Sequence, residues 1–287
     1  MRLGGLIAPV AAARGRPATA ANVARNALGD GGRVQRWAPA RDAAWRLLER
    51  YVESDARVAV VGAGNGDDLP LDRLAARAGE LDLFDLDPAA LRRARRRCAP
   101  ELRRRVRLRH CEVTAGAADR IAHAVPVGRR PRRASEPPSC LGDGGYDVVI
   151  GDLLYSQLLY PALLDAAVPR ITTRRALTRY GPALTDAVVS RMHASAGTGG
   201  RIVHLHDVVG WWDRHAQPVS LEEILAQERL HDAFALISHC QRPAGTDPRH
   251  SATRLGARVL DTALWEWPFA PGARYLVCAT VTERGAD

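Results

Sequence analysis

The sequence of 287 residues contains no lysine, so all 41 of its basic residues are arginine. This one-sided choice indicates that codon usage has shaped the composition, and it weakens the net charge of +9 as an argument for a nucleic-acid partner. Aromatic residues make up only 5% of the chain, which disfavours a platform for stacking bases. No apolar run reaches about 18 residues, so the sequence predicts no membrane-spanning helix.

Cysteine is also scarce and odd in number, and no pair has metal-ligand spacing. We therefore expect no metal site and no disulfide framework, and a reducing cytoplasm fits best. Residues 1–18 have an early arginine and an Ala-rich end, as a secretory signal does. Two glycines and a proline interrupt the apolar stretch, which favours a leader segment over a signal peptide. The five cysteines are Cys98, Cys111, Cys140, Cys240 and Cys278.

The most informative stretch is residues 57–88. A β-branched run at 58–61 breaks into Gly62, Gly64 and Gly66, passes through a helical stretch and returns as an apolar run that ends on Asp85. This pattern predicts strand, tight turn, helix and strand, the nucleotide-binding half of a doubly wound α/β fold. The glycines let the backbone approach a ligand, and an acid at the strand tip suits ribose hydroxyls.

The residues after the glycines decide which nucleotide is expected. A dinucleotide fingerprint requires a small residue at its sixth position, where this chain has Asp67 followed by Asp68. Two carboxylates would repel a diphosphate. Glycines at every second position resemble motif I of the class I S-adenosylmethionine-dependent methyltransferases, whose ligand is cationic and has no phosphate. The resemblance implies S-adenosylmethionine as the cofactor.

Three further segments extend the resemblance over roughly residues 40–282. Residues 84–88, FDLDP, resemble motif II, in which Asp85 would take the ribose and Asp87 would cap the next helix. Residues 106–112 resemble the third strand, with an acid near the adenine, and 146–155 resemble motif IV. The family often has an acid where this chain has Val60, which leaves the ammonium contact to Asp67, Asp68 or Asp152. The implied cofactor-binding residues are Gly62, Gly64, Asn65, Gly66, Asp67, Asp85, Leu86, Glu112 and Asp152.

Polar residues at the ends of the predicted fourth and fifth strands are the candidates for holding or deprotonating a methyl acceptor. The segment after Ile150 partly resembles the Asp/Asn-Pro-Pro-Tyr motif of amino-group methyltransferases, with both prolines replaced by leucine. A helix cap at the same aspartate competes with this interpretation. The fifth strand, at 201–205, leads into a His-Leu-His-Asp run that lacks a third metal ligand. The candidates are Asp152, Tyr155, His206 and Asp207.

Together these observations predict an α/β, Rossmann-like doubly wound sheet of about seven strands, mostly parallel with an antiparallel C-terminal hairpin, plus an N-terminal helical cap. Residues 1–53 would form the leader and cap, and 54–287 the methyltransferase-like domain. Within that domain we expect a mobile loop at 126–145 and a helical insertion at 219–245.

The expected function is S-adenosylmethionine-dependent methyl transfer to a small-molecule acceptor. An RNA or protein methyltransferase would use the arginine-rich stretch at 92–109, which we interpret as a solvated surface. An aminopropyltransferase shares the fold and favours paired acids, and a non-catalytic cofactor-binding module is the third alternative. Nucleic acid is thus the less favoured partner, and the oligomeric state stays open, a homodimer included.

Overall fold

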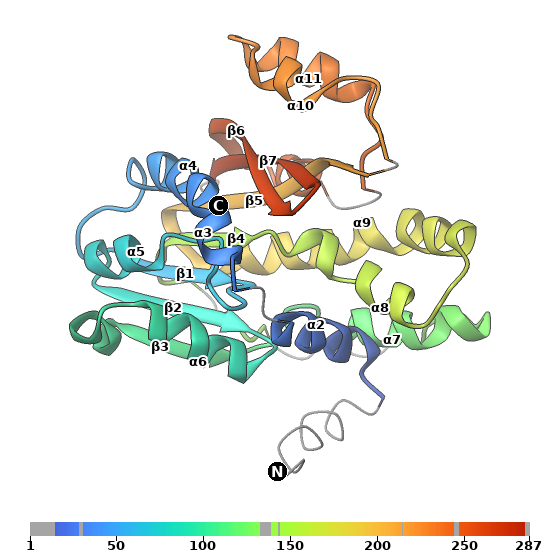
Figure 1. The fold of residues 1–287 in the computed structure, drawn as a ribbon. Coiled ribbons are helices and arrows are strands. Elements are labelled where there is room, and N and C mark those ends of the chain that lie inside the picture. Colours follow the sequence, from blue (N-terminus) through green and yellow to red (C-terminus); the bar gives the residue numbers. More distant parts are fainter. Residues whose placement is uncertain are drawn as a thin grey trace.

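The computed structural model describes residues 15–28, 31–132, 139–142, 144–213, 215–243 and 247–284. A seven-stranded sheet of order β3-β2-β1-β4-β5-β7-β6 forms its centre (Figure 1). Strands β1 to β5 are parallel, and β7 runs antiparallel to both β5 and β6. This confirms the predicted sheet and its C-terminal hairpin. The strands are β1 (Arg57–Val61), β2 (Glu80–Asp85), β3 (Val106–His110), β4 (Tyr146–Asp152), β5 (Ala196–Trp212), β6 (Arg258–Ala270) and β7 (Ala273–Glu283).

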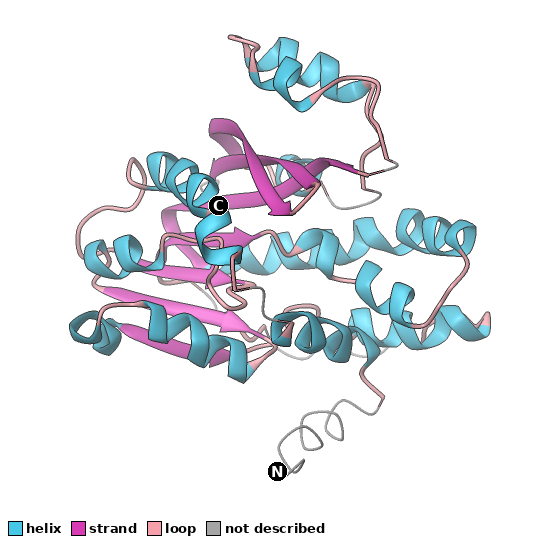
Figure 2. Ribbon diagram, viewed as in Figure 1, coloured by secondary structure: helices cyan, strands magenta, loops and turns pink. Residues whose placement is uncertain are grey.

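Helices cover both faces of the sheet (Figure 2), because its central strands carry apolar side chains on both sides. One face packs on α4 (Ala38–Leu48), α5 (Leu71–Arg77) and α6 (Pro88–Arg97). The other face packs on α9 (Arg170–Ser195) and α12 (Pro248–Arg254).

The remaining helices extend this framework at its margins. A separate apolar cluster joins the first half of α9 to α2 (Pro17–Ala27), α7 (Ala117–Ala124) and α8 (Tyr160–Asp165). The inserted helices α10 (Leu221–Leu225) and α11 (Leu230–Ser238) pack on the ends of β5 and β7. Short helical turns complete the described elements: α3 (Arg33–Arg36), η1 (Pro100–Arg105), η2 (Val125–Val127) and η3 (Tyr155–Gln157).

Three helix starts follow directly from local sequence. Asp87 accepts a hydrogen bond from the Ala89 amide at 2.8 Å and so caps α6, as predicted. Ser220 and Glu223 form a reciprocal capping box on α10. Asp247 accepts from the Arg249 amide at 3.0 Å ahead of Pro248, at the start of α12.

Strand β5 differs most from expectation, since it continues for seven residues beyond the predicted end at 205. Antiparallel pairing with β7 accompanies it along this extension, from the pair Leu205–Ala279 to the pair Trp212–Ala273. Two helices, α8 and the long α9, which contains Pro182, connect β4 to β5. The helical insertion predicted at 219–245 contains two helices, α10 and α11.

The expectation of no disulfide was wrong. Cys111, directly after β3, is bonded to Cys140, which precedes β4, with a Cα–Cα distance of 5.8 Å. A spacing of 29 residues gives no local signal, and only the fold brings the two side chains together. Cys98, Cys240 and Cys278 are buried and free. Of the helices the structure describes, none combines the length and apolar character needed to cross a bilayer.

Candidate functional site

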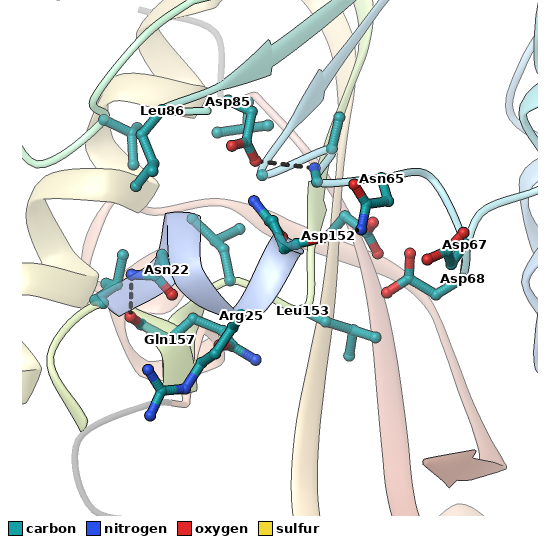
Figure 3. A pocket seen from close by; sticks show the side chains of 18 of the residues that line it. Asn22, Arg25, Asn65, Asp67, Asp68, Asp85, Leu86, Asp152, Leu153 and Gln157 are labelled. Carbon is teal, nitrogen blue, oxygen red and sulfur yellow. Dashed lines mark hydrogen bonds between the residues drawn. The ribbon is translucent and has the colours of Figure 1, made fainter. Parts of the chain in front are cut away.

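A cavity of about 430 Å³ opens at the carboxyl ends of β1, β2 and β4 (Figure 3). Ligands bind at this edge in parallel α/β sheets, and the volume suits a nucleoside-sized ligand. Its floor comes from the glycine turn and the ends of β2 and β4, and its wall from α2. Of the predicted cofactor-binding residues, it brings together Gly62, Gly64, Asn65, Asp67, Asp85, Leu86, Glu112 and Asp152.

The three glycines of the turn share a positive φ but differ in the space around the position of a Cβ. All have positive φ, at 80° for Gly62, 47° for Gly64 and 64° for Gly66. A Cβ on Gly66 would lie 2.2 Å from a methyl of Leu71, so this residue serves helix packing and does not line the cavity. A Cβ on Gly64 would be in ordinary van der Waals contact with Asn26 Oδ1 at 3.6 Å. The positive φ of Gly64, and not crowding, is therefore what favours glycine at this position of the cavity lining.

Asp85 lies at the tip of β2, as predicted, and is held by two backbone amides. Its Oδ2 accepts from Gly64 N at 2.9 Å and its Oδ1 from Asp87 N at 2.8 Å. Burial raises the pKa of this carboxyl to about 6, although the two N–H donors oppose the rise. The carboxylate retains acceptor capacity toward the cavity, since each oxygen can accept more than one hydrogen bond.

Asp68, which is half-buried, and Asp152, which is buried, form a carboxyl pair at another part of the cavity wall (Figure 3). Burial raises the pKa of Asp68. Burial, together with the charge of Asp68 and that of Asp85, raises the pKa of Asp152 well above its ordinary value. Among the described residues, Asp152 Oδ1 has no hydrogen-bond partner. Asp152 therefore does not cap a helix, and the pair has unsatisfied acceptor capacity suited to a cation.

Asp67 and Asn65 line the cavity but are occupied by structural contacts. Asp67 forms ion pairs with Arg33 and Arg97. Asn65 donates to the carbonyl of Asn26 at 2.9 Å and accepts from Arg93 Nε at 2.7 Å. Both side chains connect the glycine turn to neighbouring helices. Of the three acids predicted to contact the ammonium group of the implied cofactor, Asp68 and Asp152 therefore remain as candidates.

Glu112 and Leu86 line the cavity from the ends of β3 and β2. The Glu112 carboxylate turns back onto its own loop, where Oε1 accepts from Thr114 N at 3.0 Å and from Thr114 Oγ1 at 2.6 Å, and Oε2 accepts from Gly116 N. It orders the loop that borders the adenine end predicted for the cavity.

Helix α2 and the β6–β7 hairpin supply cavity residues that the sequence did not reveal. Asn22 donates to the Gln157 carbonyl at 3.0 Å, and Arg25 binds both Asp165 oxygens at 2.9 Å. From the hairpin come Trp267 and Phe269, whose carbonyl accepts from the Trp37 indole at 3.0 Å. These contacts join segments more than 130 residues apart, so local patterns carry no signal for them.

The complete strand order, with β7 alone reversed, is the sheet that the sequence resemblance implies.

Neither a protein-family model nor a curated protein sequence matches the chain. Among solved structures, a SAM-dependent methyltransferase from Aquifex aeolicus is similar at 13% identity and a TM-score of 0.45, over 90% of this chain and 95% of the other. Geranyl diphosphate C-methyltransferase from Streptomyces coelicolor A3(2) is similar at 14% identity and 0.44, over 85% and 78%. A Bordetella parapertussis structure, named as a possible exported protein, is similar at 17% identity and 0.45, over 88% and 68%.

Of the four predicted catalytic residues, the fold places only Asp152 in the cleft. Tyr155 is buried beneath it, with its hydroxyl 2.6 Å from His204 Nδ1, and burial raises the pKa of the phenol. His206 and Asp207 line a second cavity. They do not stand at the carboxyl end of β5, because this strand continues past them to Trp212. Across the described residues, no group of three or more His, Cys, Asp or Glu side chains is arranged to hold a metal ion.

Proposed function

We propose that this protein is an S-adenosylmethionine-dependent methyltransferase. The observation that carries the proposal is the Asp68–Asp152 carboxyl pair in the same cleft as Asp85. Asp85 would accept from the ribose hydroxyls, the glycine turn would border the ligand, and the carboxyl pair would hold the ammonium. When bound, S-adenosylmethionine supplies an electrophilic methyl group on its sulfonium.

The chain's own contribution to transfer is positioning. Helix α2 is fixed over the cleft by Asn22, Arg25 and Thr19, whose hydroxyl donates to Asp119 at 2.8 Å. A wall held this firmly aligns an acceptor and limits the entry of water. We assign no general base, and Asp152 acts in this proposal by binding a cation.

The acceptor we propose is a small molecule. Trp37, Trp267 and Phe269 line one side of the cleft, and Trp37 and Trp267 are about 5% exposed. Their rings contact one another, with centroids 4.9 Å apart for Trp37 and Trp267 and 5.0 Å for Trp267 and Phe269. This aromatic wall, with Phe269 at 37% exposure beside two buried tryptophans, suits an apolar portion of a small acceptor. We propose the cytoplasm as its compartment because three of the five cysteines are free, although the Cys111–Cys140 disulfide is of a kind that is rare in reducing compartments.

Isothermal titration with S-adenosylmethionine, S-adenosylhomocysteine, decarboxylated S-adenosylmethionine and NAD tests the cofactor. We expect micromolar binding of the first two and no binding of NAD. Absence of binding by all four would refute the proposal.

Aminopropyl transfer is the second candidate, because the Asp68–Asp152 pair could equally hold an amine acceptor. Preference for the decarboxylated cofactor in the same titration would select it. An RNA methyltransferase would instead show polynucleotide binding that falls steeply with salt.

A further inference from the structure

A second cavity, of about 600 Å³, lies between β5 and the helices α9 and α12. Residues 154–157 lie between this cavity and the first one. Leu154 and Gln157 line the first cavity, and Ser156, between them in the chain, hydrogen-bonds to Asp207, which lines the second. The two cavities are therefore separated by residues 154–157. Neither the predicted cofactor nor its acceptor accounts for the second one.

The floor of this cavity carries polar atoms that the described chain leaves unsatisfied. His206 is 2% exposed, and neither of its ring nitrogens has a partner within hydrogen-bond geometry. The nearest carboxylate oxygen, Asp247 Oδ1, is 3.6 Å from His206 Nε2. Asp207 is 7% exposed, and its Oδ1 also lacks a partner. Burying such groups without partners is unfavourable, so they mark a place where a polar ligand would bind favourably.

Two further acids at the cavity are already neutralised by neighbours. Asp247 is paired with Arg249 through Oδ2 at 2.6 Å, and Asp186 is paired with Arg254 and accepts from Ser251. These pairs leave no free negative charge at their positions.

Two arginines at the cavity carry charges that no carboxylate pairs. Arg174 and Arg242 line it, and within the described ranges neither forms an ion pair. Burial raises the pKa of Asp207 and lowers that of His206 to about 4, so the imidazole is neutral and carries one N–H donor. The available donors are thus the two guanidinium groups and the His206 N–H.

We propose that this second cavity binds a small molecule through an anionic group, a carboxylate or a phosphate. Arg174 and Arg242 at the opening attract the anion, and His206 on the floor donates a hydrogen bond to it. Pro182 lines the same cavity from within α9. A proline has no backbone N–H, so α9 lacks one intrahelical hydrogen bond beside the cavity.

Isothermal titration of the full-length protein with inorganic phosphate and, separately, with succinate tests the proposal in a buffer free of other multivalent anions. We expect saturable binding of at least one of the two, and the preferred probe identifies the anionic group. The double variant Arg174→Ala/Arg242→Ala should bind at least tenfold more weakly. A matched variant, Arg95→Ala/Arg96→Ala, removes two exposed arginines of α6 and should bind like the wild type.

The floor is tested separately with His206→Phe, which keeps a similar ring volume but removes both nitrogens. We expect it to keep the wild-type melting temperature, or exceed it, while anion affinity falls several-fold. The absence of saturable binding by the wild type would overturn the proposal. Equal losses in the two double arginine variants would also overturn it, because they would show general charge attraction. The cofactor proposal is independent, since S-adenosylhomocysteine affinity should be the same in all these variants.

Discussion

Replacing Asp152 by asparagine should reduce the proton release that accompanies cofactor binding. Asp68 and Asp152 face each other, with Arg33 and Arg41 lowering the pKa of Asp68 and Asp85 raising that of Asp152. Because both pKa values are raised overall, the pair holds a proton at a pH where an isolated carboxyl, with a pKa of about 3.9, is ionised. An ammonium bound between the carboxylates favours the ionised pair, so binding releases that proton.

The magnitude follows from linkage. Release of one proton makes affinity rise by up to about tenfold per pH unit, or about 1.4 kcal/mol, across the titration of the pair. In Asp152→Asn the carboxyl whose pKa is raised furthest is gone, together with the proton that it holds. Burial still raises the pKa of Asp68, so the affinity of the variant should depend less steeply on pH than that of the wild type, and the contribution of Asp85, whose pKa is about 6, is common to both proteins.

Calorimetry in buffers of different ionisation enthalpy, between about pH 5.5 and 8.5, counts the protons directly. The quantity to compare is the number released by the wild type minus the number released by Asp152→Asn. Asp232→Asn, at an exposed site on α11, loses one carboxylate elsewhere and should match the wild type. Equal proton release by wild type and Asp152→Asn would show that the pair does not meet the cation.

The same pair affects the stability of the free protein. A raised carboxyl pKa in the folded state means that the folded protein binds more protons than the unfolded chain. The free energy of unfolding therefore falls as pH rises above the unfolded pKa of about 3.9 and through the folded value. Asp152→Asn removes this loss, so its melting temperature should exceed that of the wild type by a margin that grows with pH.

Four further outcomes are expected. Asp85→Ala should weaken S-adenosylhomocysteine binding by about 1.5–3 kcal/mol, measured by titration, while Arg95→Ala leaves it unchanged. Gly66→Ala should lower the free energy of unfolding by more than about 1 kcal/mol, because its φ is 64°, yet the folded fraction should keep its cofactor affinity. Tyr155→Phe should cost about 1–3 kcal/mol of stability with little change in turnover per folded molecule, since it lies outside the cleft. Cys140→Ser should lose about 3.5 kcal/mol in denaturant titrations without reductant, given a disulfide that spans 29 residues, and adding reductant should remove the difference from wild type.

The fold was predictable because each of its signals is local. A β-branched run followed by glycines requires a strand and a turn with positive φ, and β1 with Gly62, Gly64 and Gly66 has both. Parallel pairing then places the ends of β1, β2 and β4 at one edge, which is why Asp85 and Asp152 share a cleft.

The choice between neighbouring acids was not predictable. Asp67 and Asp68 are identical in chemistry, and only the turn between β1 and α5 decides that Asp67 meets Arg33 and Arg97 while Asp68 meets Asp152. The same limit applies to His206. Alternation along a strand shows that it shares a face with His204, but not which helices cover that face.

Under the proposed function, the spacing between the glycine turn and α5 accounts for how the cleft would select a cationic ligand. Dinucleotide sites place a diphosphate on the N-terminus of a helix that starts within the glycine turn. Here α5 starts at Leu71, and residues 67–70 stand between it and Gly66. Those residues place Asp68 in the cleft and keep the N-terminus of α5 away from it. The longer turn therefore presents a carboxylate where a dinucleotide site presents the helix N-terminus that binds phosphate. The acid missing at Val60 is thereby replaced from the other side of the turn, where its partner Asp152 arrives from β4.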